Sequence, residues 1–138
     1  MILSPTEGLT EFNPSQFWIL VVEDYPDTLN LAKQVLERKG FNVLQASTGQ
    51  QGIDLAYEND VDLVLLDIKL PDIIGFDVCS RIKGMDKVKI PIVIFFTVLS
   101  LNADRQRALE AGGDDYLEKH LNGDDLVSFI KKWLDPDG

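Results

Sequence analysis

Five polar residues whose side chains could do metal or phosphate chemistry stand at the ends of short apolar segments. Glu23 and Asp24 follow the first of these segments, Asp67 follows the third, Thr97 closes the fourth, and Lys119 follows the fifth. Three carboxylates brought side by side repel one another and are costly to bury without a cation. An all-oxygen donor set suits a hard divalent metal, and Mg²⁺ held by a couple of carboxylates fits best. A hydroxyl and an ammonium group beside that metal would neutralise a phosphoryl group placed on one of the carboxylates.

These residues can meet only if the segments before them lie side by side in one sheet. Runs of apolar residues without polar alternation are typical of strands buried on both faces, and the chain has five: Phe17–Val22, Phe41–Ala46, Val61–Leu66, Ile90–Phe96 and Tyr116–Leu117. Helical spacing of apolar residues follows each run, from Pro26 to a stop at Gly40, over Thr48–Asn59, from Phe76 to Gly84, over Asp104–Ala111, and over Leu126–Leu134.

Strict alternation of strand and helix predicts an α/β fold with a doubly wound parallel sheet that helices cover on both faces. Such sheets bind their ligands just outside the C-terminal ends of the strands. All five candidate residues would stand at that edge of the sheet, although they are far apart in the sequence. The fold class and the candidate site therefore support each other.

The composition is that of one soluble globular domain. The chain has 138 residues, of which 45% are hydrophobic and 26% are charged, so it can form a core and is not intrinsically disordered. A formal charge of -10 disfavours nucleic acid and anionic membranes as partners. The single cysteine, Cys79, excludes an internal disulfide and fits a reducing compartment.

Targeting signals are not expected in this chain. The first basic residue is Lys33, so a secretory signal with a basic leading region is absent. The longest nearly apolar stretch, Ile90–Leu101, contains polar residues and a proline and is shorter than the roughly 20 apolar residues of a membrane span. We therefore expect a soluble protein in the cytoplasm.

Four sequence stretches carry a specific combination of motifs: Leu20-Val-Val-Glu-Asp24, Val64-Leu-Leu-Asp67 with Leu70-Pro71 and Gly75, Ile94-Phe-Phe-Thr97, and Ala111-Gly-Gly-Asp-Asp-Tyr-Leu-Glu-Lys119. Each would be weak evidence alone, but here all five polar positions occur in order at strand ends. With these motifs the chain resembles the response-regulator receiver domains of two-component signalling, a CheY-like family, over about residues 16–134. The resemblance implies a flavodoxin-like (βα)5 fold with strand order 2-1-3-4-5.

The resemblance also implies roles for the acidic residues. Asp67 would accept a phosphoryl group from a phosphohistidine on a histidine kinase or phosphotransfer protein. Asp24 and Asp67 would bind Mg²⁺ directly, with the backbone carbonyl of Lys69 as a third protein ligand. Glu23 would act mainly through a metal-bound water.

The remaining matched residues would read out the phosphorylation. Thr97 would hydrogen-bond one phosphoryl oxygen and Lys119 would pair with another. Tyr116 would be the switch aromatic, which turns inward when Thr97 moves toward the phosphoryl group. The output would be a contact with a downstream protein effector, since no DNA-binding output domain fits within the chain. The domain boundaries expected are a flexible leader over 1–15, the receiver domain over 16–134, and a tail or linker over 135–138.

Alternative interpretations stay open beside this one. The chain could be a pseudo-receiver, a constitutive protein-interaction module on the same fold, although all five core residues are present. An independent enzyme is not expected, because the chain has no dinucleotide-binding or P-loop glycine motif. A haloacid-dehalogenase-type phosphatase would need a second Asp where Lys69 stands. A solvated rim is the expected role of four basic residues, with a partner contact second: Arg81, Lys83, Lys87 and Lys89.

Four positions depart from the usual family pattern. They are Val98 and Leu99 after the threonine, Ile74 before the glycine, and His120 in place of the proline that normally follows the lysine. Val98 and Leu99 put apolar bulk where water would approach Asp67, so slow self-dephosphorylation is expected. Because a non-proline cis peptide costs about 2.5–4 kcal/mol, we expect the peptide between Lys119 and His120 to be trans.

Overall fold

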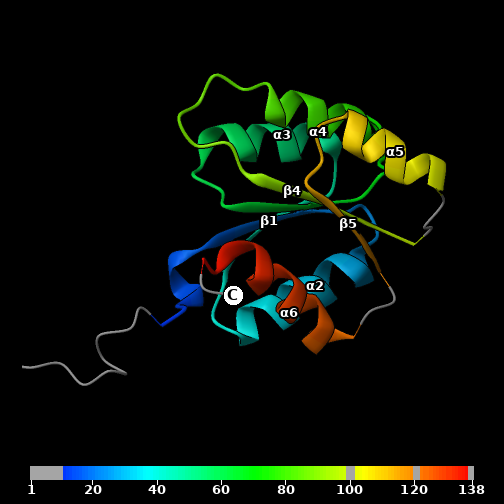
Figure 1. Ribbon diagram of the computed structural model, residues 1–138. Coiled ribbons are helices and arrows are strands. Elements are labelled where there is room, and N and C mark those ends of the chain that lie inside the picture. The colour runs from blue at the N-terminus through cyan, green and yellow to red at the C-terminus, as the bar shows by residue number, and fades with distance from the viewer. Residues whose placement is uncertain (1–10, 99–101, 120–121, 137–138) are drawn as a thin grey trace, which may run out of the picture.

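The computed structural model describes residues 11–98, 102–119 and 122–136. Strands and helices alternate along these residues (Figure 1), after one short 3₁₀ turn, η1 (Pro14–Gln16). The elements are β1 (Trp18–Val22), α2 (Pro26–Arg38), β2 (Asn42–Ala46), α3 (Gly49–Glu58), β3 (Leu63–Leu66), α4 (Gly75–Lys83), β4 (Ile92–Thr97), α5 (Asn102–Glu110), β5 (Asp115–Glu118) and α6 (Gly123–Leu134).

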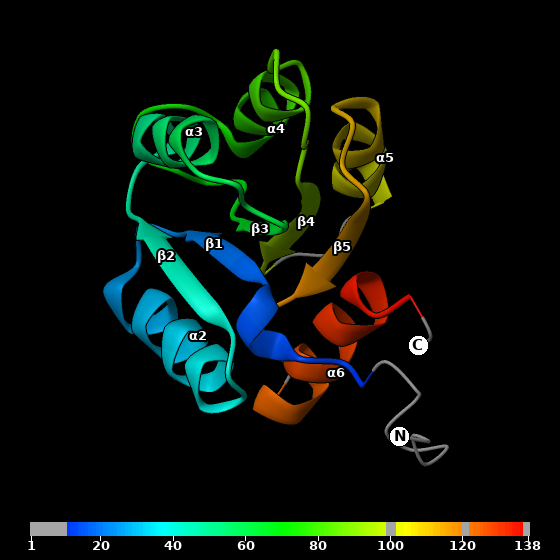
Figure 2. The same ribbon diagram turned by 90° about the vertical axis from the view of Figure 1, so that its left-hand side faces the viewer.

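The five strands form one parallel sheet in the order β2-β1-β3-β4-β5, which Figure 2 shows side by side. Helices α3, α4 and α5 cover one face of the sheet, and α2 and α6 cover the other (Figure 1). The predicted doubly wound α/β fold and its 2-1-3-4-5 strand order are confirmed. Since β1 and β3 are neighbours, with Val22 opposite Leu66, the residues that follow these two strands come together.

The core consists of two layers, one on each face of the sheet. Successive residues of β3 point to opposite sides: Leu63 and Leu65 pack with α2 and α6, whereas Val64 and Leu66 pack with the helices of the other face. All four are fully buried, which explains why the central strands are apolar without alternation. Within the described residues, no helix combines the length and the apolar character needed to cross a bilayer.

The strand ends differ slightly from the apolar runs. Thr97 closes β4, as predicted, whereas β5 extends beyond its apolar pair to include Asp115 and Glu118. The physical reason is that the ladder follows backbone hydrogen bonding to the neighbouring strand, which does not depend on side-chain polarity. Thr97 therefore belongs to the rigid sheet, opposite Glu118 of β5.

The described part of the expected leader packs against the domain. The Phe12 ring stacks on Phe17 with a centroid distance of 5.2 Å and lies 6.0 Å from the Phe41 ring. From α6, the Lys131 ammonium lies 5.6 Å from the centroid of Phe12, and Figure 2 shows this N-terminal segment beside α6. Residues 1–10 lie outside the described residues, so the domain boundary near residue 16 stays a prediction.

Three of the four basic residues expected on a solvated rim make polar contacts with distant segments of the chain. Lys83 pairs with Asp114 at 2.5 Å, and Lys89 pairs with Asp62. The ammonium of Lys87 donates to two carbonyl oxygens at the C-terminal end of α3, those of Ala56 at 2.9 Å and Asn59 at 2.7 Å. These contacts join segments about 30 residues apart, which no local pattern indicates.

Candidate metal centre

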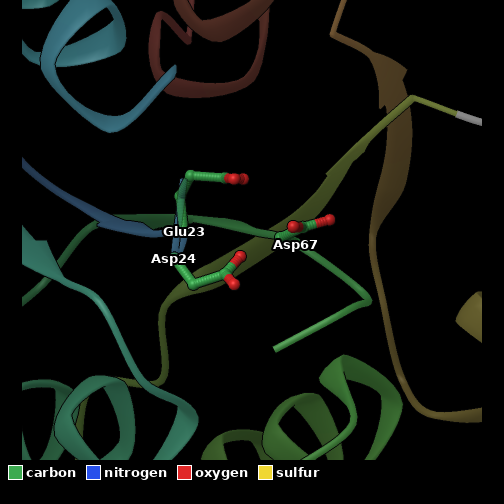
Figure 3. A group of neighbouring side chains, drawn as sticks. All are labelled: Glu23, Asp24 and Asp67. Carbon is green, nitrogen blue, oxygen red and sulfur yellow. The ribbon is translucent and has the colours of Figure 1, made fainter. Parts of the chain in front are cut away.

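Three carboxylates gather at the C-terminal edge of the sheet. Glu23 and Asp24 directly follow β1, Asp67 directly follows β3, and each contributes an oxygen within 4.8 Å of the other two. Figure 3 shows their carboxyl groups around one common space. Glu23 and Asp67 are buried, at 1% and 6% exposure, whereas Asp24 is exposed. The prediction that these three residues would meet is confirmed by this geometry.

Lys119 lies between two of the three carboxylates. Its Nζ is 3.1 Å from Oδ2 of Asp67 and forms a second ion pair with Oε2 of Glu23. The Lys119 side chain is only 12% exposed, so both ion pairs are largely shielded from water. One ammonium therefore faces two buried carboxylates, and the cluster carries a surplus of negative charge.

The pKa of Glu23 is shifted by its burial at this edge. It is raised from an ordinary value of 4.5 to about 7, mainly because burial removes the carboxylate from water. The hydrogen bond from Lys119 lowers this pKa, but not enough to offset the burial, and the negative charge of Asp67 raises it further. Without a metal, Glu23 therefore holds a proton more readily than a free carboxylate does.

Backbone hydrogen bonds fix Asp67 and Lys119 at the edge of the sheet. The Asp67 N–H donates to the Val22 carbonyl at 3.0 Å, and the Lys119 N–H donates to the Thr97 carbonyl at 2.9 Å. Both bonds continue a strand ladder beyond the strand itself. The Ile68 N–H donates to Oδ1 of Asp67 at 2.8 Å, which leaves Oδ2 directed at Lys119.

An open cavity of about 600 Å³ lies over these residues. Six residues singled out from the sequence line it: Glu23, Asp24, Asp67, Lys69, Thr97 and Lys119. Four lining residues were missed by sequence reasoning: Tyr25, Thr28, Ile68 and Asp104. Their positions in the sequence could have indicated them, because each lies within a few residues of a strand end or in the first turn of the following helix. Val98 also lines the cavity and is 68% exposed.

Tyr116 lies on β5 next to the site and does not line this cavity. It stands opposite Phe95 of β4 and packs partly into the core beneath α3, α4 and α5. The guanidinium of Arg105 lies 5.6 Å from its ring centroid. Partial burial raises the pKa of its hydroxyl, and the charge of Asp104 adds to the effect. Tyr116 and Asp104 are therefore electrostatic neighbours at the edge of the site.

Two predictions fall on residues outside the described ranges. Leu99, expected to narrow the approach to Asp67, lies in 99–101. His120 lies in 120–121, so the isomer of its peptide bond with Lys119 stays a prediction.

Comparison with known proteins decides the family. Residues 19–131 match the response regulator receiver domain, which is most of the chain. The chain belongs to this family. Over 108 residues it is 39% identical to YrkP of Bacillus subtilis, an uncharacterised transcriptional regulatory protein, covering 78% of this chain and 45% of the relative. The chain thus spans about half the length of the curated relatives it matches.

Solved receiver structures share the fold closely. A two-component response regulator from Clostridium difficile superposes with a TM-score of 0.82 at 30% identity, covering 89% of this chain and 99% of that one. The receiver domain of the sensor histidine kinase PA1611 from Pseudomonas aeruginosa gives a TM-score of 0.79 at 28% identity, with coverages of 86% and 97%. That structure has a magnesium ion coordinated in its active-site cleft.

The relatives bear on one earlier expectation. The charge of the chain disfavours nucleic acid as a partner, but relatives such as YrkP are named transcriptional regulators and are about twice as long. The expectation of no nucleic-acid partner does not fit these longer relatives. That expectation concerns only the 138 residues of this chain, and it rests on their formal charge of -10.

Proposed function

We propose that this receiver domain accepts a phosphoryl group on Asp67 from a histidine kinase or phosphotransfer protein in the cytoplasm, and signals by phosphorylation-dependent contact with a downstream protein. The observation that carries the proposal is the position of Asp67, buried at the end of β3 with one carboxylate oxygen 3.1 Å from Lys119 Nζ. Two further carboxylates lie within 4.8 Å. The domain acts as a phosphoacceptor and not as an independent enzyme.

The side chains divide the chemistry among them. A carboxylate oxygen of Asp67 attacks the phosphorus of the donor phosphohistidine, the P–N bond breaks, and its electron pair returns to the imidazole of the donor. Lys119 Nζ then pairs with one phosphoryl oxygen, and the Thr97 hydroxyl donates to another. Both residues belong to or adjoin strands, so they offer these donors without rearrangement of the sheet. Tyr116 turns inward as the side chain of Thr97 moves toward the phosphoryl group, which alters the surface formed by α5 and β5.

The donor set fits Mg²⁺. It consists of oxygen ligands only, and Lys119 pairs with only two of the three carboxylates. Asp24, Asp67 and the Lys69 carbonyl would hold the ion, with Glu23 acting through a water. When bound, Mg²⁺ supplies the positive charge that offsets the carboxylates and the incoming phosphoryl group.

Two treatments test the proposal on the whole chain. Acetyl phosphate with Mg²⁺ should add one phosphoryl group, detected by intact-mass spectrometry, and beryllofluoride should raise the melting temperature. Asp67→Ala should abolish both responses, because the attacking oxygen is removed. Asp86→Asn is the matched control, since Asp86 is exposed and far from the cavity.

The outcomes separate the phosphorylatable receiver from a pseudo-receiver. Identical responses of the wild type and Asp67→Ala would contradict the proposal. Mg²⁺ alone should also stabilise the wild type, by about 2.7 kcal/mol at a hundredfold excess over the dissociation constant. Asp24→Asn should blunt this stabilisation. A melting curve unchanged by millimolar Mg²⁺ would contradict the metal assignment.

A further inference from the structure

The loop from Asp67 to Gly75 carries two of the ligands assigned above, the Asp67 carboxylate and the Lys69 carbonyl. A carbonyl ligand has no side-chain freedom, so its position depends entirely on the backbone of this loop. Lys69 lines the cavity but is not part of a strand or helix. Something outside the strands must therefore hold the loop in place.

One backbone hydrogen bond joins the two ends of the loop. The Gly75 N–H donates to the Ile68 carbonyl at 2.7 Å, which closes the loop on itself. The approach is so close that a Cβ at Gly75 would lie 2.2 Å from the backbone oxygen of Asp67. This contact holds the two ends of the loop together, and Leu70 and Ile73 between them pack against the core. The polar side chain of Asp72 is held in another way.

Asp72, near the middle of the loop, is hydrogen-bonded to helix α3. The two carboxylate oxygens of Asp72 each accept a backbone hydrogen bond from the first turn of α3, Oδ1 from Gly49 at 2.8 Å and Oδ2 from Gln50 at 2.9 Å. The next free N–H, that of Gln51, is taken by the Thr48 hydroxyl at 3.1 Å. The N-terminus of α3 is thus capped by its own Thr48 and by Asp72 from the distant loop.

Gly49 leaves the space that this contact needs. A Cβ at Gly49 would lie 2.8 Å from Val78 Cγ2 and 3.2 Å from Oδ1 of Asp72, so a larger residue would push the loop away. The hydrogen bonds from Gln50 and Gly49 hold the pKa of Asp72 below its ordinary value of 3.8. Asp72 is therefore a charged acceptor at the positive end of a helix dipole.

Helix α3, which Asp72 caps, also contacts the strand that precedes Glu23 and Asp24. Helix α3 packs directly on β1, where a Cβ at Gly52 would lie 2.8 Å from Val22 Cγ2. Val22 is the residue immediately before Glu23 and Asp24. Asp72 thus links the loop that follows β3, through α3, to the strand that presents the other two carboxylates.

We propose that Asp72 is a positioning residue, which holds the loop between β3 and α4, and with it the Lys69 carbonyl, at the separation from Glu23 and Asp24 that Mg²⁺ binding requires. This inference rests on the proposed function, since it assigns a new residue to the same site. Asp72 does not line the cavity, so it acts only through the loop.

The test compares three variants of the whole chain by Mg²⁺ titration calorimetry. Asp72→Asn should raise the dissociation constant for Mg²⁺ by up to about tenfold, the lower end of what the loss of an outer-shell partner costs. Thr48→Ala removes the other cap of the same helix and should lower the melting temperature while leaving the Mg²⁺ affinity within twofold. Asp86→Asn should change neither.

Amide hydrogen exchange of the metal-free protein gives a second readout. In Asp72→Asn, exchange should accelerate at Gly49 and Gln50 and through the loop before Gly75, whereas Thr48→Ala should affect α3 without the loop. At saturating Mg²⁺, the rate of phosphorylation by acetyl phosphate should return to within twofold of the wild type.

The possible results separate this inference from the function on which it rests. If the wild type binds Mg²⁺ and Asp72→Asn binds it equally well, the positioning role is wrong and the proposed function stands. If Thr48→Ala weakens Mg²⁺ as much as Asp72→Asn does, general stability of α3 explains the effect and the positioning role is again wrong. If the wild type binds no Mg²⁺, both proposals fall.

Discussion

At the scale of single residues, the site is governed by unbalanced charge. Lys119 is shared by Glu23 and Asp67, so neither carboxylate has a cation of its own among the described residues. A buried ion pair is favourable only when the attraction repays the loss of hydration of both partners. Here the metal-free protein meets part of that cost by favouring the protonated form of Glu23.

The first prediction follows from the pKa of Glu23, which is about 7 in the folded protein against an ordinary 4.5. Because the folded state keeps this proton to higher pH than the unfolded chain, the free energy of unfolding should fall as pH rises from about 4.5 to about 7. Urea unfolding in EDTA across this range measures the slope. Glu23→Gln should remove this component of the slope, whereas Asp86→Asn should retain it. Equal slopes in the wild type and Glu23→Gln would contradict the assignment.

The second prediction concerns Val98, which lines the cavity and is largely exposed. Its apolar side chain lines the same cavity as Asp67 and offers no group to orient an attacking water. Val98→Ala should speed self-dephosphorylation by a few-fold to about tenfold. Decay of the phosphorylated protein by intact mass is the measurement. Val88→Ala is the matched control, because Val88 is fully exposed away from the cavity; equal decay in the two variants would rule out a steric role for Val98.

At the scale of elements, short loops decide where the candidate metal ligands lie. The turn into α4 is possible only because Gly75 lacks a side chain, since the atoms that a Cβ would meet belong to the backbone of Asp67 and Ile68 and cannot move aside. The same glycine appears in the sequence motif, where its purpose is not evident. The structure gives the reason, which is the close approach of α4 to the end of β3.

The third prediction is that Gly75→Ala destabilises the protein by about 3 kcal/mol or more, because the added methyl group overpacks the loop base. It should also weaken Mg²⁺ binding, since Asp67 must shift. Gly84→Ala provides the comparison, because a Cβ there would meet its nearest atom, the Ser80 carbonyl oxygen, at 3.2 Å. Chemical denaturation and Mg²⁺ titration measure both effects. A loss of stability no greater than that of Gly84→Ala would show that the loop base can relax.

At the scale of the whole molecule, contacts between distant segments cover the exposed edge of the core. Phe12 covers the edge of the core formed by α2 and α6, and it is held between Phe17, Phe41 and Lys131. These contacts lie at the opposite end of β1 from Glu23 and Asp24, because Phe17 precedes the strand and the acids follow it. Stability and metal binding should therefore be separable at this position.

The fourth prediction is that Phe12→Ala lowers the free energy of unfolding by about 1–2 kcal/mol, less than for a fully buried phenylalanine because Phe12 is half-buried. The Mg²⁺ dissociation constant should stay within twofold of the wild type. Tyr57→Ala, which removes an exposed aromatic ring, should cost less. Denaturation and calorimetry distinguish these effects. A stability equal to that of the wild type would mean that residues 11–16 do not belong to the cooperative unit.

The order of the elements and the three carboxylates that meet at the sheet edge can be predicted from the sequence alone. Buried strands such as that of Leu63–Leu66 must be apolar on both faces, and a helix stop such as Gly40, with φ of +96°, needs a residue free of a Cβ. Parallel topology then sends every residue that follows a strand to one edge. Such signals depend on near neighbours in the chain, so they are visible without the fold.

The tertiary structure alone decided which distant partners those residues meet. The sequence does not indicate that Lys119 is shared with Glu23, that Asp72 caps α3, or that Lys87 caps the other end of that helix. Each contact joins segments more than 20 residues apart, and its geometry depends on how layers of side chains pack between them. Periodicity records only whether a residue faces the core or the solvent. The choice of partner on that face is made by packing, and this choice positions the three carboxylates of the candidate metal centre.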